Sequence, residues 1–326
     1  MKKFLTILSL LTFILLVNQV CYSKTIIKLG VVTKPGSAQN VCAERFKDLV
    51  ESKSGGNLII KIYHSASLGT ETDILQQIQM NSVQMGIITL GPFDVFVPSV
   101  KVVGFPFMFK SFEQVDRVLD GPLGKELLKD LEVAGFKGIS FSENGFRHLT
   151  NNVRPVHTVE DVKGLKIRVM ESELHKELWR ILGANPTPMG WPIYTELQQG
   201  TIDAQENPLW VIWTYKMYEV QKYLTLTGHV YSAHIDVANL NWFNSLPKSE
   251  QKLLQQSMIE AAHYERQWNR TNEAGFLAKL KKAGMIVDEH PDIASFKAKA
   301  LKLKDLPMFQ EKRTKELLEK FLEATK

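Results

Sequence analysis

The chain has 326 residues, of which 44% are hydrophobic and 23% charged, with two cysteines and a formal net charge of +5. Lys2 and Lys3 belong to a leader-like start, and without them the charge falls to +3. So small an excess, with no dense basic run interleaved with aromatics, argues against a nucleic-acid partner. Cys21 also lies in that leader, so Cys42 is left alone and no intramolecular disulfide is expected.

The first 23 residues have the pattern of a secretory signal, with two lysines before an apolar stretch at 4–17. A membrane anchor is the alternative, but about fourteen apolar residues fall short of the roughly twenty that span a bilayer. A lipoprotein leader cut before Cys21 is less favoured because Asn18 stands where an aliphatic residue is expected. We therefore expect cleavage near Ser23, export to the periplasm and a mature chain long enough for two lobes.

The next part of the chain alternates strand and helix patterns, which favours an α/β fold with a mainly parallel sheet. Strands are expected at 26–32, 58–63 and 85–90, and helices at 37–52, where Ser37 can cap, and 71–81. Two further helices are expected at 112–119 and 123–134, after an apolar loop at 105–109. Such sheets bind ligands at the carboxyl ends of their strands.

The middle of the chain continues with short elements. A strand at 136–141 runs on toward Arg147, and another at 165–170 places Arg168 and Met170 on the face opposite Ile167. Helices are expected at 173–182, 194–199, ended by Gly200, and 210–220, with a short strand at 202–204. From 248 to 273 there is neither Pro nor Gly, which predicts one helix of about 26 residues, roughly 40 Å long.

Two arginines beside a block of amide side chains indicate a site for an organic anion. Arginine keeps its charge, and its planar fork matches a carboxylate in two-point geometry. Arg168 lies within an apolar strand, where a surface charge is less expected, and Arg147 stands at a strand-to-loop junction, an expected cleft edge. A solvated surface arginine or half of an ion pair is the alternative for each. On the residues alone the two interpretations are evenly balanced.

Motifs for several enzyme classes are absent from the sequence. It contains no Gly-x-Ser-x-Gly, His-Glu-x-x-His, Cys-x-x-Cys or Gly-x-Gly-x-x-Gly pattern, and its eight histidines show no metal-ligand spacing. Because catalytic groups are brought together in space, this absence is weak evidence. We expect a protein that is not an enzyme and needs no metal or cofactor.

Several motifs together resemble one family, the extracytoplasmic solute-binding proteins of tripartite ATP-independent periplasmic (TRAP) transporters, of the dicarboxylate-binding type. They are Ser-Leu-Gly at 67–69, Phe-Pro-Phe at 105–107, Asn-Gly-Phe-Arg at 144–147, Lys-Gly-Leu-Lys-Ile-Arg-Val at 163–169, Gly-Ala-Asn-Pro-Thr-Pro-Met at 183–189, Leu-Gln-Gln-Gly at 197–200, Asp-Ala-Gln-Glu-Asn-Pro at 203–208 and Tyr-Glu-Val-Gln-Lys-Tyr-Leu at 218–224. The resemblance covers nearly the whole mature chain.

The resemblance implies a type II-like periplasmic-binding fold in which two lobes close on a ligand by a hinge, braced by the long helix. Lobe I comprises 24–144 and 232–271, and lobe II comprises 145–231 and 272–326. The resemblance also implies binding roles for six side chains. Arg168 is the carboxylate clamp, Arg147 a second contact, Asn207 a hydrogen-bonding partner and Trp191 the aromatic packing surface, with Glu71 and Thr89 reaching the distal part of the ligand.

The sequence departs from the family pattern at two places in the expected pocket wall. Ala204 stands where glycine is usual, so the turn need not be left-handed. The segment between Met189 and Leu197 is one residue shorter than usual and lacks a Glu before Tyr194, so Pro192 is expected to start the short helix. The ligand can therefore differ from the common dicarboxylates.

The leading interpretation is a monomeric periplasmic protein that captures an organic acid and delivers it to the membrane subunits of a permease driven by an ion gradient. A sensor that presents the acid to a membrane receptor is the alternative. A secreted hydrolase or lyase that holds an acidic substrate with Arg147 and Arg168 is a third, less favoured interpretation.

Overall fold

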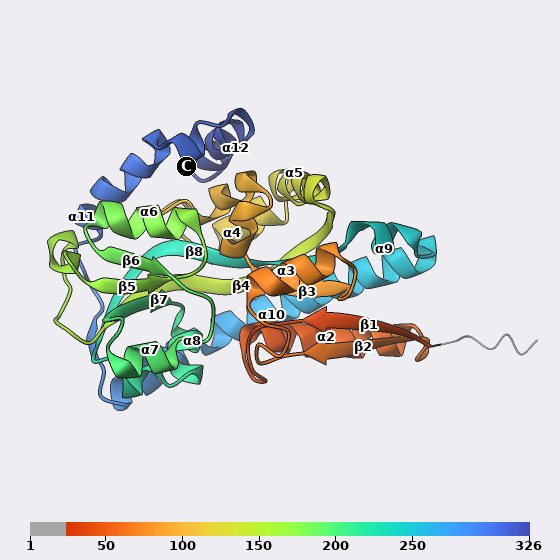
Figure 1. Ribbon diagram of the computed structural model, residues 1–326, viewed down its shortest axis with the longest axis horizontal. Coiled ribbons are helices and arrows are strands. Elements are labelled where there is room, and N and C mark those ends of the chain that lie inside the picture. Colours follow the sequence, from red (N-terminus) through yellow and green to blue (C-terminus); the bar gives the residue numbers. More distant parts are fainter. Residues whose placement is uncertain (1–23) are drawn as a thin grey trace, which may run out of the picture.

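The computed structural model describes residues 24–326, so the predicted leader at 1–23 lies outside the described residues. Within this range the strands form a nine-stranded sheet in the order β2-β1-β3-β8-β4-β7-β5-β6, with β9 (Ile286–Asp288) paired to β8. Helices cover both sides of this sheet (Figure 1). The mixed α/β architecture agrees with the fold class expected from the sequence.

Parallel strands form the two ends of the sheet. One end holds β1 (Thr25–Gly30), β2 (Leu58–Tyr63) and β3 (Met85–Thr89), and the other holds β5 (Lys166–Val169), β6 (Asn185–Pro188) and β7 (Ala204–Asn207). Figure 1 places these two groups on opposite sides of the molecule, in red to orange and in green. The predicted lobe I contains the first group and the predicted lobe II contains the second.

Two long antiparallel strands cross the centre, β4 (Phe136–Asn151) and β8 (Tyr223–Asn239). The prediction of a mainly parallel sheet was therefore wrong for the middle of the molecule, because the sequence pattern of β8 was not recognised as a strand. Both faces of β8 are buried, and polar residues such as Thr227, His229 and Asp236 occupy buried positions along it. His229 and Asp236 hydrogen-bond to Glu206 of β7 and Ser140 of β4, so β8 lacks the alternation of apolar and polar residues that marks a half-buried strand.

Most predicted helices are found where the sequence placed them. The shorter predicted ones are α2 (Ala38–Lys53), α3 (Glu71–Gln79), α4 (Phe112–Leu119), α5 (Pro122–Asp130), α6 (Glu173–Leu182), α7 (Tyr194–Gln199) and α8 (Leu209–Thr214). The structure adds α9 (Leu240–Ser245), α11 (Ile293–Ala300) and α12 (Lys312–Ala324). Ser37 caps α2 by accepting from the Asn40 backbone N–H, as expected. The predicted helix at 210–220 is shorter than expected, because α8 ends at Thr214 and a 3₁₀ turn follows.

The long helix α10 (Lys248–Lys282) has 35 residues and extends beyond its predicted end at 273. It contacts α2, which packs with β1 to β3, the central strand β4, and α8, which follows β7, and so it runs from one end of the sheet toward the other. Gly275 does not stop it, because a helical glycine costs only about 1 kcal/mol and two buried residues one turn apart, Phe276 and Leu280, follow it. The prediction of a helix bracing both lobes agrees with these contacts.

The apolar core is divided into three clusters rather than one. One lies between α2, α10 and the strands β1 to β3, a second around α8 and the end of α10, and the largest around η2 (Pro98–Gly104), α6 and the middle of β8. Cys42 is buried in the first cluster. The C-terminal α12 packs on η2, although the sequence division places these two segments in different lobes.

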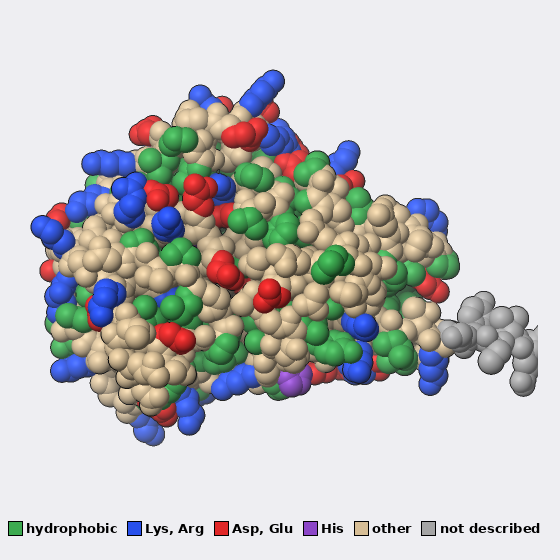
Figure 2. Space-filling view, viewed as in Figure 1, with side chains coloured by type: hydrophobic (Ala, Val, Ile, Leu, Met, Phe, Trp, Pro, Cys, Tyr) green, Lys and Arg blue, Asp and Glu red, His purple; other side chains and the backbone are tan. Residues whose placement is uncertain are grey.

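The surface carries charge of both signs. Figure 2 shows Lys and Arg side chains interspersed with Asp and Glu over the visible face, with apolar side chains scattered among them. Within residues 24–326, no helix has the length and hydropathy needed to cross a membrane.

Candidate functional site

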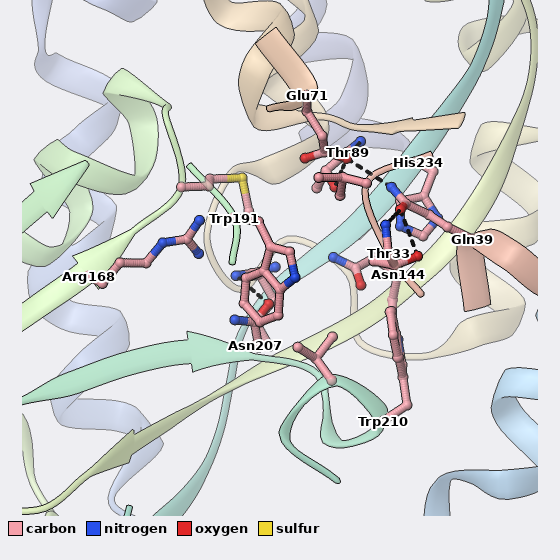
Figure 3. Close-up of a pocket in the computed structure, with 14 residues that line it drawn as sticks. Thr33, Gln39, Glu71, Thr89, Asn144, Arg168, Trp191, Asn207, Trp210 and His234 are labelled. Carbon is pink, nitrogen blue, oxygen red and sulfur yellow. Dashed lines mark hydrogen bonds between the residues drawn. The ribbon is translucent and has the colours of Figure 1, made fainter. Parts of the chain in front are cut away.

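A cavity lies between the two groups of parallel strands. Its wall takes side chains from both lobes and from the central strands (Figure 3). The lining residues are Val32, Thr33, Gln39, Glu71, Thr89, Asn144, Arg147, Arg168, Met170, Trp191, Asn207, Trp210, Val211 and His234. All six site residues predicted from the sequence are therefore brought to one cavity, and the ligand roles assigned to them stay predictions.

The alternation of β5 directs Arg168 into the cavity. Ile167 and Val169 lie in the apolar core, whereas Arg168 and Met170 line the cavity on the other face of the strand. The predicted facing of this strand is confirmed. β5 pairs with β6 and β7 on its two sides, so the backbone that carries Arg168 is held within the sheet.

Arg168 is buried but has no carboxylate partner in the described part of the chain. It is 4% exposed, and its Nε and Nη2 donate to the backbone carbonyl of Met189 at 2.8 and 2.5 Å. Burial, and then the positive charge of Arg147, lower the pKa of Arg168 to about 10, so the group is still cationic at neutral pH. Nη1 makes no hydrogen bond among residues 24–326, and so a cationic donor remains for a ligand.

Arg147 has a different environment. It is 1% exposed within β4, and its guanidinium pairs with Glu206 through Nε and, at 2.9 Å, through Nη2. The same Nη2 donates to the Glu206 carbonyl and to Asn207 Oδ1 at 3.1 Å. The expectation of a strand-to-loop junction was wrong, because β4 continues through Arg147 to Asn151, although Arg147 does line the cavity.

Glu206 lies behind Arg147 and is fully buried. His229 Nε2 lies 3.1 Å from Glu206 Oε2, and His175 Nδ1 lies 3.3 Å from Oε1. Burial acts to raise the pKa of Glu206, but the charge of Arg147 and the contacts with the two histidines outweigh it. The pKa of Glu206 therefore lies well below its usual value, and the carboxylate balances the charge of Arg147.

Asn207 is held in one orientation by its neighbours. Its Oδ1 accepts from Arg147, and its Nδ2 donates to Gln205 Oε1 at 2.6 Å. Gln205 in turn donates to Thr150 Oγ1 at 2.7 Å. The strand β7 carries Asn207, and Ala204 at its start has an extended backbone, as the replacement of glycine predicted.

Trp191 forms an aromatic wall beside Arg168. The guanidinium carbon of Arg168 lies 5.7 Å from the centre of the Trp191 ring. The Trp191 ring meets Tyr215 edge to face with a centroid distance of 4.6 Å. The expectation that Pro192 starts the next helix was wrong: α7 begins at Tyr194, and the peptide bond before Pro192 is cis.

Glu71 and Thr89 form part of the opposite wall, in lobe I. Glu71 Oε1 accepts three hydrogen bonds, from Gln39 Nε2, the Thr89 backbone N–H and Thr89 Oγ1, each at 2.8 Å. Burial raises the pKa of Glu71 above its usual value, although these donors oppose the rise. Oε2 has no hydrogen-bond partner in the part of the chain that the structure describes.

The sequence did not identify several residues that line the cavity. Asn144 and Trp210 lie in or beside motifs that were recognised, but Gln39 and His234 come from the start of α2 and from the unrecognised strand β8. No local pattern marks either of them. Among residues 24–326, no group of three or more His, Cys, Asp or Glu side chains is placed to hold a metal ion.

The chain matches known proteins over most of its length. Residues 29–311 match the family described as bacterial extracellular solute-binding protein, family 7. A solute-binding protein of Verminephrobacter eiseniae is 38% identical over 85% of this chain and 83% of its own length. The 2,3-diketo-L-gulonate-binding periplasmic protein of Escherichia coli is 33% identical over 83% of each chain.

The similarity to known proteins extends to their three-dimensional structures. A crystal structure of a TRAP periplasmic solute-binding protein from Polaromonas, bound to D-erythronate, superposes with a TM-score of 0.88 at 34% identity. The match covers 92% of this chain and 98% of that one. The two-lobed architecture expected from the sequence is thus shared with a solved relative. The chain belongs to the bacterial extracellular solute-binding proteins of family 7.

Proposed function

We propose that the protein captures an organic acid in the cavity by binding its carboxylate at Arg168. The observation that carries this proposal is a buried, cationic guanidinium without a carboxylate partner among residues 24–326. A buried charge is costly unless it is paired, and a ligand carboxylate supplies the pair. The low-dielectric surroundings strengthen the resulting charge-assisted hydrogen bonds.

The remaining predicted site residues surround this anchor. Arg147 retains Nη1 for a second contact, since its other donors are taken by Glu206 and Asn207. Trp191 offers an apolar face beside the carboxylate position. Glu71 and Thr89 lie on the other lobe, where they contact the distal part of the ligand.

Two hydrogen bonds between the predicted lobes support closure of one lobe on the other. The Lys34 backbone N–H donates to Tyr215 Oη at 2.9 Å, and Thr72 Oγ1 donates to Glu171 at 3.2 Å. The predicted boundaries after 144 and 231 coincide with the paired residues Gly145 and Ser232, next to a shift in the β4–β8 register. Gly145 has a φ of 113°, which other residues rarely adopt. This irregular pair is the proposed hinge.

The wider role is delivery of the acid to a membrane permease from the periplasm, by a monomer that does not alter its ligand. The E. coli relative is named as periplasmic, and the Polaromonas relative as a TRAP solute-binding protein. Presentation to a membrane receptor would use the same cavity. Uptake of labelled acid by cells lacking this protein separates the two: transport predicts lost uptake, and sensing predicts unchanged uptake.

A thermal-shift screen over organic acids tests the binding function. A ligand that binds only the folded state raises the melting temperature, by an amount that grows with its concentration relative to Kd. We expect a shift with at least one carboxylate and none with the matching neutral amide or alcohol. Recovery of the acid unchanged after incubation would agree with binding without catalysis. A panel of organic acids that gives no shift at millimolar concentration would contradict the proposal.

A further inference from the structure

The loop between β6 and α7 contacts Arg168. Met189, Gly190 and Trp191 are consecutive in it, and we call these three residues the anchor loop. The Met189 carbonyl accepts both hydrogen bonds that Arg168 donates in the described chain, at 2.8 and 2.5 Å. The Arg168 guanidinium carbon lies 5.7 Å from the centre of the Trp191 ring, and Figure 3 shows the two side chains next to each other. A carboxylate that fixes Arg168 therefore also restricts the residues on either side of Gly190.

Gly190 is the point at which the anchor loop approaches predicted lobe I most closely. A Cβ atom at position 190 would lie 2.7 Å from Thr70 Cγ2 and 3.4 Å from Glu171 Oε2. Thr70 belongs to predicted lobe I, whereas Gly190 and Glu171 belong to predicted lobe II. The φ of Gly190 is not positive, so its backbone is open to any residue. The close approach between the lobes, rather than the backbone conformation, therefore leaves room only for glycine.

Thr70 is held in place because it caps α3. Its Oγ1 accepts from the Asp73 backbone N–H at 3.2 Å and donates to Asp73 Oδ2 at 2.9 Å. The Thr70 backbone N–H donates to the same carboxylate at 2.7 Å, which completes a capping box. Rotation of the Thr70 side chain would break these bonds, so its methyl group stays toward Gly190. The next residue, Glu71, lines the cavity, and Gly190 therefore contacts lobe I one residue away from the cavity wall.

Tyr215 makes a second connection between the anchor loop and lobe I. Its ring meets the Trp191 ring edge to face, with a centroid distance of 4.6 Å. Lys34 of predicted lobe I contacts the same tyrosine twice: its backbone N–H donates to Tyr215 Oη at 2.9 Å, and its Nζ lies 4.9 Å from the centre of the ring. Neither Tyr215 nor Gly190 lines the cavity, so any effect of these residues on a ligand is indirect.

We infer that the anchor loop couples a ligand at Arg168 to closure of the lobes, with Gly190 and Tyr215 as positioning residues. This inference rests on the proposed function, because it takes the carboxylate anchor and the closing motion as given. A carboxylate fixes Arg168, and the loop bonded to it is then fixed against lobe I. The contacts of Gly190 and Tyr215 with lobe I form only in the closed arrangement, so they favour it and slow the release of the ligand without touching it.

A double-mutant cycle across the two lobes tests this inference by calorimetry with the acid identified by thermal shift. Gly190→Ala adds a methyl group that collides with Thr70 Cγ2 only in the closed arrangement, so we expect binding to weaken at least about tenfold. Thr70→Ser removes Cγ2 but keeps the hydroxyl that caps α3, so its affinity should stay within about twofold of the native value. The double variant Gly190→Ala/Thr70→Ser should recover at least about threefold of the lost affinity.

Two further measurements separate closure from a local change in the loop. Gly275→Ala is the matched control, because a methyl group there meets open space, and its affinity should stay within about twofold of the native value. Spin labels at Lys61→Cys on β2 and Lys176→Cys on α6, both exposed, report the distance between the lobes, and Cys42 is buried and stays unlabelled. Addition of the acid should change this distance in the native background and change it less with Gly190→Ala.

Tyr215→Phe tests the second connection. It keeps the ring beside Trp191 but removes the oxygen that accepts from the Lys34 N–H, so the acid should dissociate at least about threefold faster. Native affinity in folded Gly190→Ala, or a loss that Thr70→Ser does not recover, would overturn the inference and leave the carboxylate anchor standing. If no carboxylate binds the native protein, the proposed function fails, and the inference fails with it.

Discussion

Two buried arginines line the same cavity, and they differ in their partners. Arg147 faces a carboxylate, Glu206, whereas Arg168 donates only to the carbonyl of Met189 in the described chain. Both guanidiniums are nearly inaccessible to solvent, so burial does not distinguish them. The difference shows that charge compensation, rather than residue type or burial, separates an arginine that stabilises the fold from one that can bind an anion.

Removing Arg147 should have the largest effect, and the effect should be on stability. Arg147→Met leaves Glu206 buried without its cation, which we expect to lower the free energy of unfolding by about 3–5 kcal/mol. Urea denaturation monitored by circular dichroism measures this change in the free energy of unfolding. The double variant Arg147→Met/Glu206→Gln removes both charges and should recover at least about 1 kcal/mol of the loss. If Arg147→Met is as stable as the native protein, the ion pair between Arg147 and Glu206 does not stabilise the fold.

Asp236 extends the comparison to a buried carboxylate that lacks a cation at ion-pair distance among residues 24–326. Ser140 and Ser142 donate to it at 2.7 and 2.8 Å, yet burial raises its pKa from 3.8 to about 7. The folded state therefore holds this proton more tightly than the unfolded state. Its contribution to stability is complete below about pH 4 and is lost as pH rises to 7, by up to about 4 kcal/mol.

Asp236→Asn removes this titration and tests its sign. The melting temperature of the variant relative to the native protein should rise steadily between pH 4 and pH 8, because only the native protein loses stability from this group. Glu206, whose pKa is depressed, titrates at lower pH and affects both proteins equally. A difference that stays constant across this range would mean that Asp236 is ionised throughout.

Arg168→Lys should have a smaller effect, confined to affinity. Lysine keeps the positive charge but cannot present a planar fork to a carboxylate, so we expect binding to weaken by about 10- to 100-fold. Stability should stay within about 1 kcal/mol of the native value, since Arg168 has no buried carboxylate to leave unpaired. Calorimetry with the acid identified by thermal shift gives the affinity, and native affinity in this variant would exclude two-point recognition.

The sequence predicted the parts of the site that depend on local pattern. Alternation along one strand was enough to place Arg168 and Met170 on the cavity side of β5, and Gly200 correctly marked the end of α7. These features are set by residues close together in the chain. Motif resemblance added Asn207, Trp191 and the residues of lobe I, which no local pattern would have brought together.

The features that the sequence missed depend on pairing between distant segments. β8 was not recognised because its buried polar residues bond to other elements, and so the antiparallel centre of the sheet was missed with it. Glu206 stood within a quoted motif, yet its pairing with Arg147 follows only from the alignment of β7 beside β4. The same register explains why Arg147 has a carboxylate partner, a difference from Arg168 that the sequence did not show.

The central claim is that Arg168 anchors a ligand carboxylate. Arg168→Ala tests it most directly, measured by calorimetry with the acid that stabilises the native protein and by thermal melting without ligand. We predict that binding weakens by at least about 100-fold, as expected on removal of one partner of a buried charged pair, while the melting temperature without ligand falls little or rises. Unchanged affinity in the folded variant would contradict the claim.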